Sequence, residues 1–352
     1  MKVVKRIKNY FRNIRINKLI LKYKFVHIMF NDKFNKPFVD FLNNHFNSTE
    51  HLVLCKRFFS ETPFPQGDNV IEISSLKGLR FETNQKLICH SLFDAELVDY
   101  LYKHPNILTE KAYWAIWGGD LYQAKRDEKN DFVRSHFKGY LTDVDTEVAK
   151  KQYNLAEKPF YCIHAIFPIS KNTIQNITKK RKDFTQIQIN NSCDESTLQM
   201  LDVLAKFKEE NIKITTILSY GKLEFKDEII QKGRNIFKDK FEYLDTRLAP
   251  QEYALHLAQN DLLILNQNRQ QGVGNTVASL ALGNKVFIKS EISTYSKLKN
   301  FGLTVFDTNE IAKLNFDCFI TNPCAKSNQE RAMMFFDDEY KASLWRTVFN
   351  AE

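Results

Sequence analysis

The sequence lacks the features that mark disulfide-stabilised, zinc-binding and membrane-spanning proteins. Its six cysteines are scattered and form no C-x-x-C pair, so we expect neither a zinc site nor a disulfide framework. No apolar run approaches the roughly 18 residues of a spanning helix. The first residues are basic but contain no continuous apolar region and no small-residue cleavage site, so we expect no secretory signal. These absences favour a protein of the reducing cytoplasm.

Acidic residues are missing from the first 24 positions. This segment holds nine lysines and arginines while the whole chain has a net charge of +9, so the remainder is nearly neutral. A nearly neutral body argues against a nucleic-acid partner. Val3, Ile7, Phe11 and Ile14 follow a helical spacing, which predicts a basic amphipathic helix over residues 2–22. Such helices dock on anionic membranes; the alternatives are a helix packed on the body and a disordered arm.

The length of 352 residues exceeds the usual size of one hydrophobic core and predicts two domains. Strand-like and helix-like segments alternate in two series, which is typical of parallel, doubly wound sheets. We therefore expect an α/β protein with two Rossmann-like parallel-sheet domains that face each other across a cleft. The expected parts are a basic N-terminal segment at 1–24, α/β domains at 25–168 and 169–327, and a C-terminal helix at 328–352.

The stretch from residue 261 to residue 289 carries the strongest local signal. A short buried strand at 262–265 is followed by a glycine-containing loop and by an expected helix at 277–282, which Asn275 or Thr276 would cap. A helix N-terminus after such a loop binds anions, because free N–H groups and the helix dipole point at the ligand. Arg269 adds a planar donor fork that suits phosphate. The alternative is an ordinary βαβ turn, since two glycines are a weak signal.

Three polar residues lie at the carboxyl ends of expected strands in the first domain. Asn31 and Asp32 come directly after a strand at 25–30, and His90 ends a strand at 86–90. Ligands of open parallel sheets bind at the carboxyl ends of the strands, so these residues are candidates for chemistry. The alternatives are a carboxylate that only caps a turn and a histidine with a structural hydrogen bond.

An aromatic segment with paired glycines, W-A-I-W-G-G-D-L-Y, occupies residues 114–122. The glycines allow close approach of the backbone, and the tryptophans and tyrosine around one carboxylate are typical of a sugar platform. The alternative is a corner of the core in which Asp120 caps a helix. Further on, Asp143 and Asp145 form a D-x-D pattern, but a helical pattern follows at once, so we favour helix capping over metal binding.

Two of these motifs resemble those of glycosyltransferase family 56, the TDP-N-acetylfucosamine:lipid II N-acetylfucosaminyltransferases. They are W-A-I-W-G-G-D-L-Y at 114–122 and N-R-Q-Q-G-V-G-N-T at 268–276, supported by H-I-M-F-N-D at 27–32, His90, N-N-S at 190–192 and L-S-Y-G at 218–221. The resemblance implies a GT-B fold without cofactor or metal. It also implies transfer of 4-acetamido-4,6-dideoxygalactose from TDP to a polyprenyl-diphosphate-linked glycan, at the cytoplasmic face of the bacterial inner membrane.

The resemblance also implies roles for individual residues. The donor-binding residues would be Asn191, Ser192, Tyr220, Gly221, Arg269, Gln270, Gln271, Gly272, Gly274, Asn275 and Thr276. The acceptor-binding residues would be Asn31, Trp117, Gly118, Gly119 and Tyr122. The catalytic candidates are Asp32, Asp120 and His90, with Asp32 as the first choice for the base.

Three other functions remain open at this point. One is a fucosyltransferase that uses another nucleotide donor for O-antigen or capsule, and another is a non-catalytic membrane-associated binding protein. The third is a nucleotide-sugar epimerase, which would need a dinucleotide fingerprint after the first strand. Residues 25–46 contain no glycine, which argues against that third function.

Overall fold

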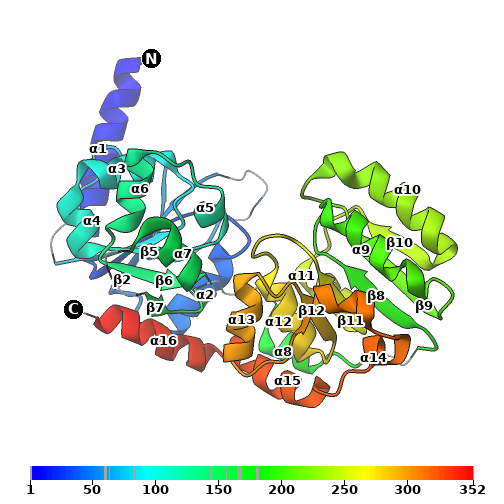
Figure 1. Cartoon of the computed structure of the whole chain (residues 1–352). Coiled ribbons are helices and arrows are strands. Elements are labelled where there is room, and N and C mark those ends of the chain that lie inside the picture. The colour runs from blue at the N-terminus through cyan, green and yellow to red at the C-terminus, as the bar shows by residue number, and fades with distance from the viewer. Residues whose placement is uncertain are drawn as a thin grey trace. The chain divides into compact units, whose positions relative to one another are not determined.

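The computed structural model describes residues 2–58, 62, 64–81, 84–142, 145–155, 157, 159–164, 169–179 and 182–351, with side chains from residue 11 onwards. It divides the chain into two compact units, Met1–Pro168 with Asp338–Glu352 and Ile169–Asp337. Each unit contains one all-parallel sheet with helices packed on it (Figure 1).

The first unit is built on a seven-stranded parallel sheet in the order β3-β2-β1-β4-β5-β6-β7. Its order reverses between β1 and β4, so the carboxyl ends of these two strands form the topological switch point where such sheets bind ligands. The strands are β1 (Phe25–Phe30), β2 (His51–Lys56), β3 (Val70–Ile73), β4 (Lys86–His90), β5 (Ala112–Ala115), β6 (Gly139–Thr142) and β7 (Phe160–Tyr161).

Two hydrophobic clusters cover the two faces of this sheet, because successive strand residues point to opposite sides. Leu52, Leu54 and Trp114 belong to one cluster, while Val53 and Tyr113 belong to the other. The helices of the unit are α1 (Lys2–Ile20), α2 (Asn35–His45), α3 (Ala95–Lys103), α4 (Pro105–Lys111), α5 (Gly119–Tyr122), α6 (Glu128–Ser135), α7 (Thr146–Tyr153) and α16 (Asp338–Asn350). Burial on both faces explains why the central strands read as continuous apolar runs.

The second unit has a six-stranded parallel sheet in the order β10-β9-β8-β11-β12-β13, and its switch point lies between β8 and β11. The strands are β8 (Thr185–Ile189), β9 (Ile212–Ile217), β10 (Phe241–Leu244), β11 (Leu262–Leu265), β12 (Lys285–Ile288) and β13 (Phe306–Asp307). The α-helices are α8 (Lys171–Gln175), α9 (Ser196–Leu204), α10 (Lys226–Phe237), α11 (Pro250–Gln259), α12 (Val273–Ala281), α13 (Ser293–Asn300), α14 (Phe316–Ile320) and α15 (Ala325–Ala332). The 3-10 turns are η1 (Ala205–Phe207), η2 (Leu223–Phe225), η3 (Lys238–Lys240), η4 (Thr308–Lys313) and η5 (Met333–Phe336).

Two expected helices are wrong in their extent. The helix after β11 begins at Val273, not at residue 277, because Gly272 adopts the left-handed conformation and ends the loop there. The expected continuous helix at the C-terminus is broken at Asp337, whose backbone is extended. Asp337 also receives a 2.7 Å hydrogen bond from Lys171, so α15 and η5 stay in the second unit while α16 packs in the first.

Helix α1 is fixed to the first unit by its C-terminal half. Ile16 and Ile20 are buried in the core, and Asn17 donates a 3.0 Å hydrogen bond to the carbonyl of Gly78. Phe11 and Ile14 are 65% and 37% exposed on the outer side of the helix, and Leu21, directly after it, is 56% exposed. None of the helices among the described residues combines the length and apolar character needed to cross a bilayer.

Candidate functional site

The loops after β8 and β11 are joined side by side at the switch point of the second unit. The backbone N–H of Asn266 donates to Asn190 Oδ1 over 2.8 Å. Gln267 Nε2 donates to Asn191 Oδ1 over 2.9 Å, and Gln271 Nε2 donates to Ser192 Oγ over 2.6 Å. The resemblance predicts donor-binding residues in both loops, and these hydrogen bonds join the two loops in the structure.

Gly272 sets the close approach of these loops and begins α12. Its φ is +70°, and a Cβ atom on it would collide with the side-chain amide of Asn191. No side chain caps α12, and the hydroxyl of Thr276 bonds back to the Gly272 carbonyl within the first turn. The first N–H groups of α12, from Val273 onwards, therefore lie at the loop without a side-chain cap, which is the geometry of an anion site. Gly274 and Asn275, both half-buried, lie in this first turn.

Two arginines lie near the half-buried Tyr220 at the end of β9. Burial raises the pKa of Tyr220, while the positive charges of Arg247 and Arg269 act in the opposite direction. The Arg247 guanidinium carbon lies 6.0 Å from the centre of the Tyr220 ring. Neither arginine forms an ion pair with any of the residues that the structure describes. Sequence reasoning missed Arg247; its signal is its place just after β10, as Arg269 follows β11.

The remaining donor candidates lie around these loops. The backbone N–H of Cys193 donates to the Tyr220 carbonyl over 2.8 Å, which holds Tyr220 and Gly221 beside the loop after β8. Arg269 and Gln271 line a small pocket together with Gln267, Ile288, Ile292 and Thr294. Gln270, half-buried between them, completes a polar, cation-bearing edge formed by β8, β9 and β11.

In the first unit, Asp32 lies directly after β1, at the switch point. Its Oδ1 accepts a 2.7 Å hydrogen bond from the backbone N–H of Phe34, just before α2. Burial raises the pKa of Asp32 to about 6, although the Phe34 N–H and the Lys33 charge favour the ionised form. A carboxylate with such a pKa is ionised at neutral pH and still basic enough to accept a proton.

Asn31 holds the protein's own backbone. It is fully buried, its Nδ2 donates to the carbonyl of Thr62 over 3.1 Å, and its Oδ1 accepts from the N–H of Phe58 over 2.6 Å. Because both ends of the amide are occupied, these contacts favour a structural role over acceptor binding.

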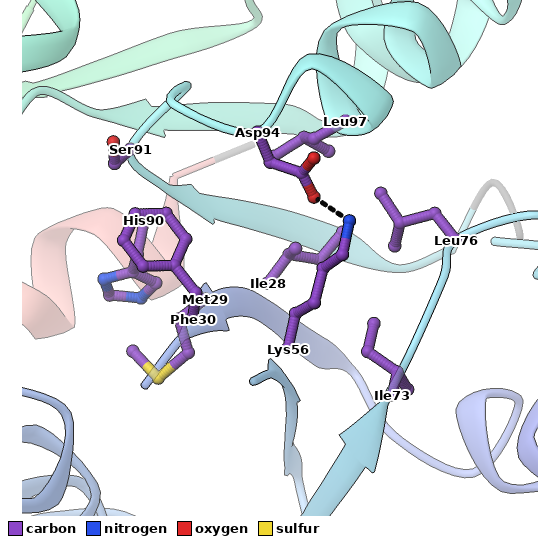
Figure 2. Close-up of a pocket in the computed structure, with 10 residues that line it drawn as sticks. All are labelled: Ile28, Met29, Phe30, Lys56, Ile73, Leu76, His90, Ser91, Asp94 and Leu97. Carbon is purple, nitrogen blue, oxygen red and sulfur yellow. Dashed lines mark hydrogen bonds and ion pairs between the residues drawn. The ribbon is translucent and has the colours of Figure 1, made fainter. Parts of the chain in front are cut away.

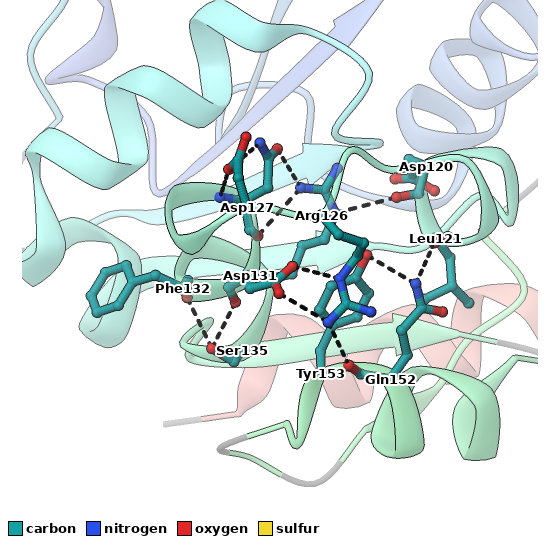
Figure 3. Close-up of polar contacts among 11 residues, drawn as sticks. Asp120, Leu121, Arg126, Asp127, Asp131, Phe132, Ser135, Gln152 and Tyr153 are labelled. Carbon is teal, nitrogen blue, oxygen red and sulfur yellow. Dashed lines mark hydrogen bonds and ion pairs between the residues drawn. The ribbon is translucent and has the colours of Figure 1, made fainter.

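Asp120 is a buried hydrogen-bonding centre of the glycine corner. Its Oδ2 accepts from Leu92 N–H at 2.8 Å and from Trp114 Nε1 at 2.7 Å, and its Oδ1 accepts from Trp117 N–H at 2.9 Å. Burial raises its pKa, and these donors act against that rise. Figure 3 shows that the next residue, Leu121, is also hydrogen-bonded: its carbonyl accepts from Gln152 Nε2 over 3.1 Å. Both carboxylate oxygens of Asp120 accept hydrogen bonds, which favours a structural role for this residue.

His90 belongs to a chain of buried imidazoles. His27 Nδ1 lies 3.1 Å from His90 Nε2, and His27 Nε2 lies 3.2 Å from His51 Nδ1. Burial lowers the pKa of His90 to about 3 and that of His51 to about 4, and it lowers the pKa of His27 well below its usual range. Burial likewise lowers the pKa of His164, which was not predicted, to about 4. All four are neutral at pH 7 and poorly suited to accept a proton.

The aromatic side chains of the 114–122 motif do not form an open platform. Trp114 is fully buried, and Trp117 is half-buried with its ring centre 5.0 Å from that of Phe34. The hydroxyl of Tyr122 donates to Asp145 Oδ1 over 2.8 Å. Gly118 is buried as the N-cap of α5, and Gly119 opens that helix.

The D-x-D pattern is only partly covered by the structure. Asp143 lies outside the described residues, and Asp145 is buried at the start of α7. Among the residues that are described, no three His, Cys, Asp or Glu side chains are grouped so as to hold a metal ion.

Comparison with known proteins gives one family match. Residues 64–352 match the model of the family described as 4-alpha-L-fucosyltransferase, glycosyl transferase group 56. No curated protein matches the chain.

Solved structures of the same fold cover nearly the whole chain. A glycosyltransferase from Rickettsia africae ESF-5 has a TM-score of 0.64 at 11% identity and covers 93% of this chain and 98% of its own. A trehalose-6-phosphate synthase from Burkholderia multivorans has a TM-score of 0.65 at 8% identity, with 94% and 98% covered. The E. coli trehalose-6-phosphate protein bound with UDP-2-fluoro glucose has a TM-score of 0.63 at 8% identity, with 93% and 99% covered. These identities show the fold alone, which is the GT-B type. On the family match, the chain belongs to the 4-alpha-L-fucosyltransferases, glycosyltransferase group 56, and is a glycosyltransferase.

Proposed function

We propose that this enzyme moves 4-acetamido-4,6-dideoxygalactose, or a similar deoxysugar, from a TDP-sugar to a polyprenyl-diphosphate-linked oligosaccharide in bacterial surface polysaccharide synthesis. One observation carries the donor half of the proposal: the uncapped N-terminus of α12 lies at the edge where the β8 and β11 loops are bonded together, beside Arg269, which forms no ion pair with a described residue. A diphosphate has the charge and shape for this edge.

In the proposed reaction, Asp32 takes the proton from an acceptor hydroxyl. The hydroxyl oxygen attacks the anomeric carbon while the bond from that carbon to the phosphate oxygen breaks, and TDP leaves with the electron pair. Arg269 and the N–H groups of α12 stabilise the charge on the leaving diphosphate. No metal is needed in this scheme, because the cationic edge takes over that role.

Asp32 is preferred as the base over the two other candidates. Both carboxylate oxygens of Asp120 accept hydrogen bonds within the protein. His90 has a pKa of about 3, which makes it a weak base. Asp32, with a pKa of about 6, is matched to general-base work near pH 7.

Helix α1 is the proposed membrane contact. Its outer side carries Phe11 and Ile14 beside the exposed bases Arg15 and Lys18, and the exposed Leu21 follows directly after the helix. An apolar stripe flanked by positive charge is complementary to an anionic lipid surface. The proposal is peripheral, reversible docking at the cytoplasmic face of the inner membrane, where a polyprenyl-linked acceptor resides.

A second candidate is a fucosyltransferase with another nucleotide donor, since the family description names fucose transfer without naming the nucleotide. Thermal shift with TDP, UDP and GDP separates the two, because a ligand raises the melting temperature according to its affinity. We expect the largest shift with TDP. A larger shift with GDP would redirect the function to a GDP-dependent fucosyltransferase.

A further inference from the structure

An exposed aromatic cluster lies at the carboxyl edge of the first sheet. It consists of Phe30, Phe58 and Phe93, and we refer to it as the phenylalanine cluster. The ring centre of Phe30 lies 5.5 Å from that of Phe58 and 6.3 Å from that of Phe93. Phe58 is 60% exposed and Phe93 is 50% exposed. Phe58 and Phe93 each contact the half-buried Phe30, and the apolar patch they form marks a binding surface more often than a scattered single residue does.

The position of Phe93 is fixed by the backbone of the glycine corner. A Cβ atom on Gly119 would lie 2.5 Å from Phe93 Cζ, so the ring rests on this glycine and any larger residue would displace it. The Phe93 N–H donates to Ser91 Oγ over 3.3 Å, and Ser91 has a φ of 78°, which is rare outside glycine. Strained residues of this kind cluster at functional sites. The missing side chain of Gly119 therefore leaves the space that the exposed Phe93 ring occupies.

The cluster lies beside the proposed base. Phe30 ends β1 two residues before Asp32, and Phe93 follows β4, the strand that pairs with β1 at the switch point. Whatever the cluster binds is therefore held near the carboxylate that must accept the hydroxyl proton. The buried Trp114 and the half-buried Trp117 offer no comparable open face.

The charge next to the cluster argues for a sugar over a lipid diphosphate. Figure 2 shows the adjoining pocket, whose lining includes Phe30, Lys56 and Asp94. Lys56 Nζ lies 2.7 Å from Asp94 Oδ2 and 2.8 Å from Glu96 Oε2, so one positive charge faces two negative ones. Because Lys56 is engaged by both carboxylates, it is not free to bind a diphosphate, and the exposed rings of Phe58 and Phe93 offer a contact that suits the apolar face of a sugar ring.

We infer that Phe93 and Phe58 form the platform on which the accepting sugar ring of the glycan stacks, with its hydroxyl presented to Asp32. A pyranose ring has an apolar face of C–H groups that packs on aromatic rings, and its hydroxyl edge remains free for chemistry. This inference rests on the proposed function, because it assigns the acceptor to the first unit.

The test compares Phe93→Ala and Phe58→Ala with wild type in transfer to a C10 prenyl diphosphate that carries a disaccharide of N-acetylhexosamines. Loss of the stacking face should raise the acceptor KM at least about tenfold in Phe93→Ala, while stabilisation by TDP stays as in wild type. Phe93→Tyr keeps an aromatic face and should retain the wild-type KM. Tyr102→Ala, which removes another exposed ring of the same unit, is the matched control and should leave KM unchanged.

Two results would overturn the inference. One is an acceptor KM in Phe93→Ala that equals the wild-type value. The other is reduced sedimentation with anionic vesicles at an unchanged KM, which would make the cluster a membrane contact. A wild-type enzyme that binds no TDP and transfers nothing would instead refute the proposed function itself.

Discussion

Gln271 Nε2 donates a 2.6 Å hydrogen bond to Ser192 Oγ and thereby joins the loop after β11 to the loop after β8. Each loop follows a strand at the switch point of the second sheet. The bond therefore lies at the carboxyl edge of that sheet, where the N-terminus of α12 and Arg269 also lie. The proposed diphosphate site thus rests on two joined loops, and its positive charge comes from Arg269 and the N-terminus of α12.

Arg269→Ala should lower transfer at least about a hundredfold, by analogy with the loss of one donor that stabilises developing charge. Because Arg269 is exposed and unpaired among the described residues, the melting temperature should stay near the wild-type value. Arg234→Ala is the matched control, since Arg234 is also exposed and lies 5.8 Å from a tyrosine ring, that of Tyr243. A loss of less than about threefold in Arg269→Ala would rule out the diphosphate role.

Asp32→Asn should abolish transfer and raise stability at neutral pH. The folded-state pKa of about 6 lies above the ordinary value of 3.8, so the folded chain binds its proton more tightly than the unfolded chain does. The ionised carboxylate therefore costs stability, fully so above pH 6, and its removal should contribute about 1–3 kcal/mol at pH 7.5. Asparagine keeps an oxygen that can accept from Phe34 N–H.

The pH profile of kcat/KM provides a second reading of Asp32. We expect activity to fall as the pH drops through about 6, because the protonated carboxyl cannot act as a base. A profile that stays flat down to pH 5, or an Asp32→Asn enzyme with more than about a tenth of wild-type activity, would assign the base elsewhere.

The buried histidines should make the enzyme sensitive to acid. His51, His90 and His164 have folded-state pKa values of about 4, 3 and 4, below the ordinary value of 6.5. The unfolded chain therefore binds more protons below pH 6.5, and stability should be lost as the pH falls from 6.5 towards 4. Each histidine contributes up to about 1.4 kcal/mol per pH unit in this window.

Urea unfolding at pH 7.0 and pH 5.0 measures this effect. The free energy of unfolding should be lower at pH 5.0, and His51→Gln, which can keep a hydrogen bond to His27 but does not titrate, should reduce the difference. Equal unfolding free energies at both pH values would show that the imidazole chain is charged in the fold, contrary to its burial.

Transfer should survive removal of divalent metal ions, since arginine and the dipole of α12 are proposed to stabilise the leaving group. EDTA should therefore leave the rate of the purified enzyme within about twofold of the untreated rate. EDTA-sensitive activity that Mg²⁺ restores and that Asp143→Asn removes would establish the D-x-D pattern as a metal site.

Binding to anionic vesicles should depend on the outer side of α1. Replacing Arg15, Lys18 and Lys22 by glutamine should remove most of the salt-sensitive binding, at about 1 kcal/mol or less per base. Phe11→Ser with Leu21→Ser should remove the salt-resistant part. Point variants are preferable to deletion of the helix, because Ile16 and Ile20 belong to the core. Full co-sedimentation of both variants would place the docking surface elsewhere.

Much of the sheet structure could be predicted because parallel strands buried on both faces are short apolar runs with polar ends. Strand bounds such as Phe25–Phe30 and Leu262–Leu265 agree with the structure. The start of α12 could not be placed, because it depends on the left-handed Gly272 and on its contact with Asn191, residues far apart in the sequence.

Side-chain exposure was the weakest part of the sequence interpretation. The motif at 114–122 indicated Trp114 and Trp117 as the sugar-binding rings. The exposed ring that packs on Gly119 is instead Phe93, which follows another strand. In the same way, Arg247 has no motif around it, and only the fold brings its charge near Tyr220. Pairings between strand ends follow from topology, which a single sequence specifies only indirectly.

The most direct measurement of the central claim is transfer of a radiolabelled sugar from TDP-4-acetamido-4,6-dideoxygalactose to the C10 prenyl diphosphate disaccharide. We predict a labelled glycolipid with wild-type enzyme and at least about a hundredfold less with Arg269→Ala. GDP-fucose should give little product under the same conditions. Product from GDP-fucose but none from the TDP-sugar would contradict the proposed function.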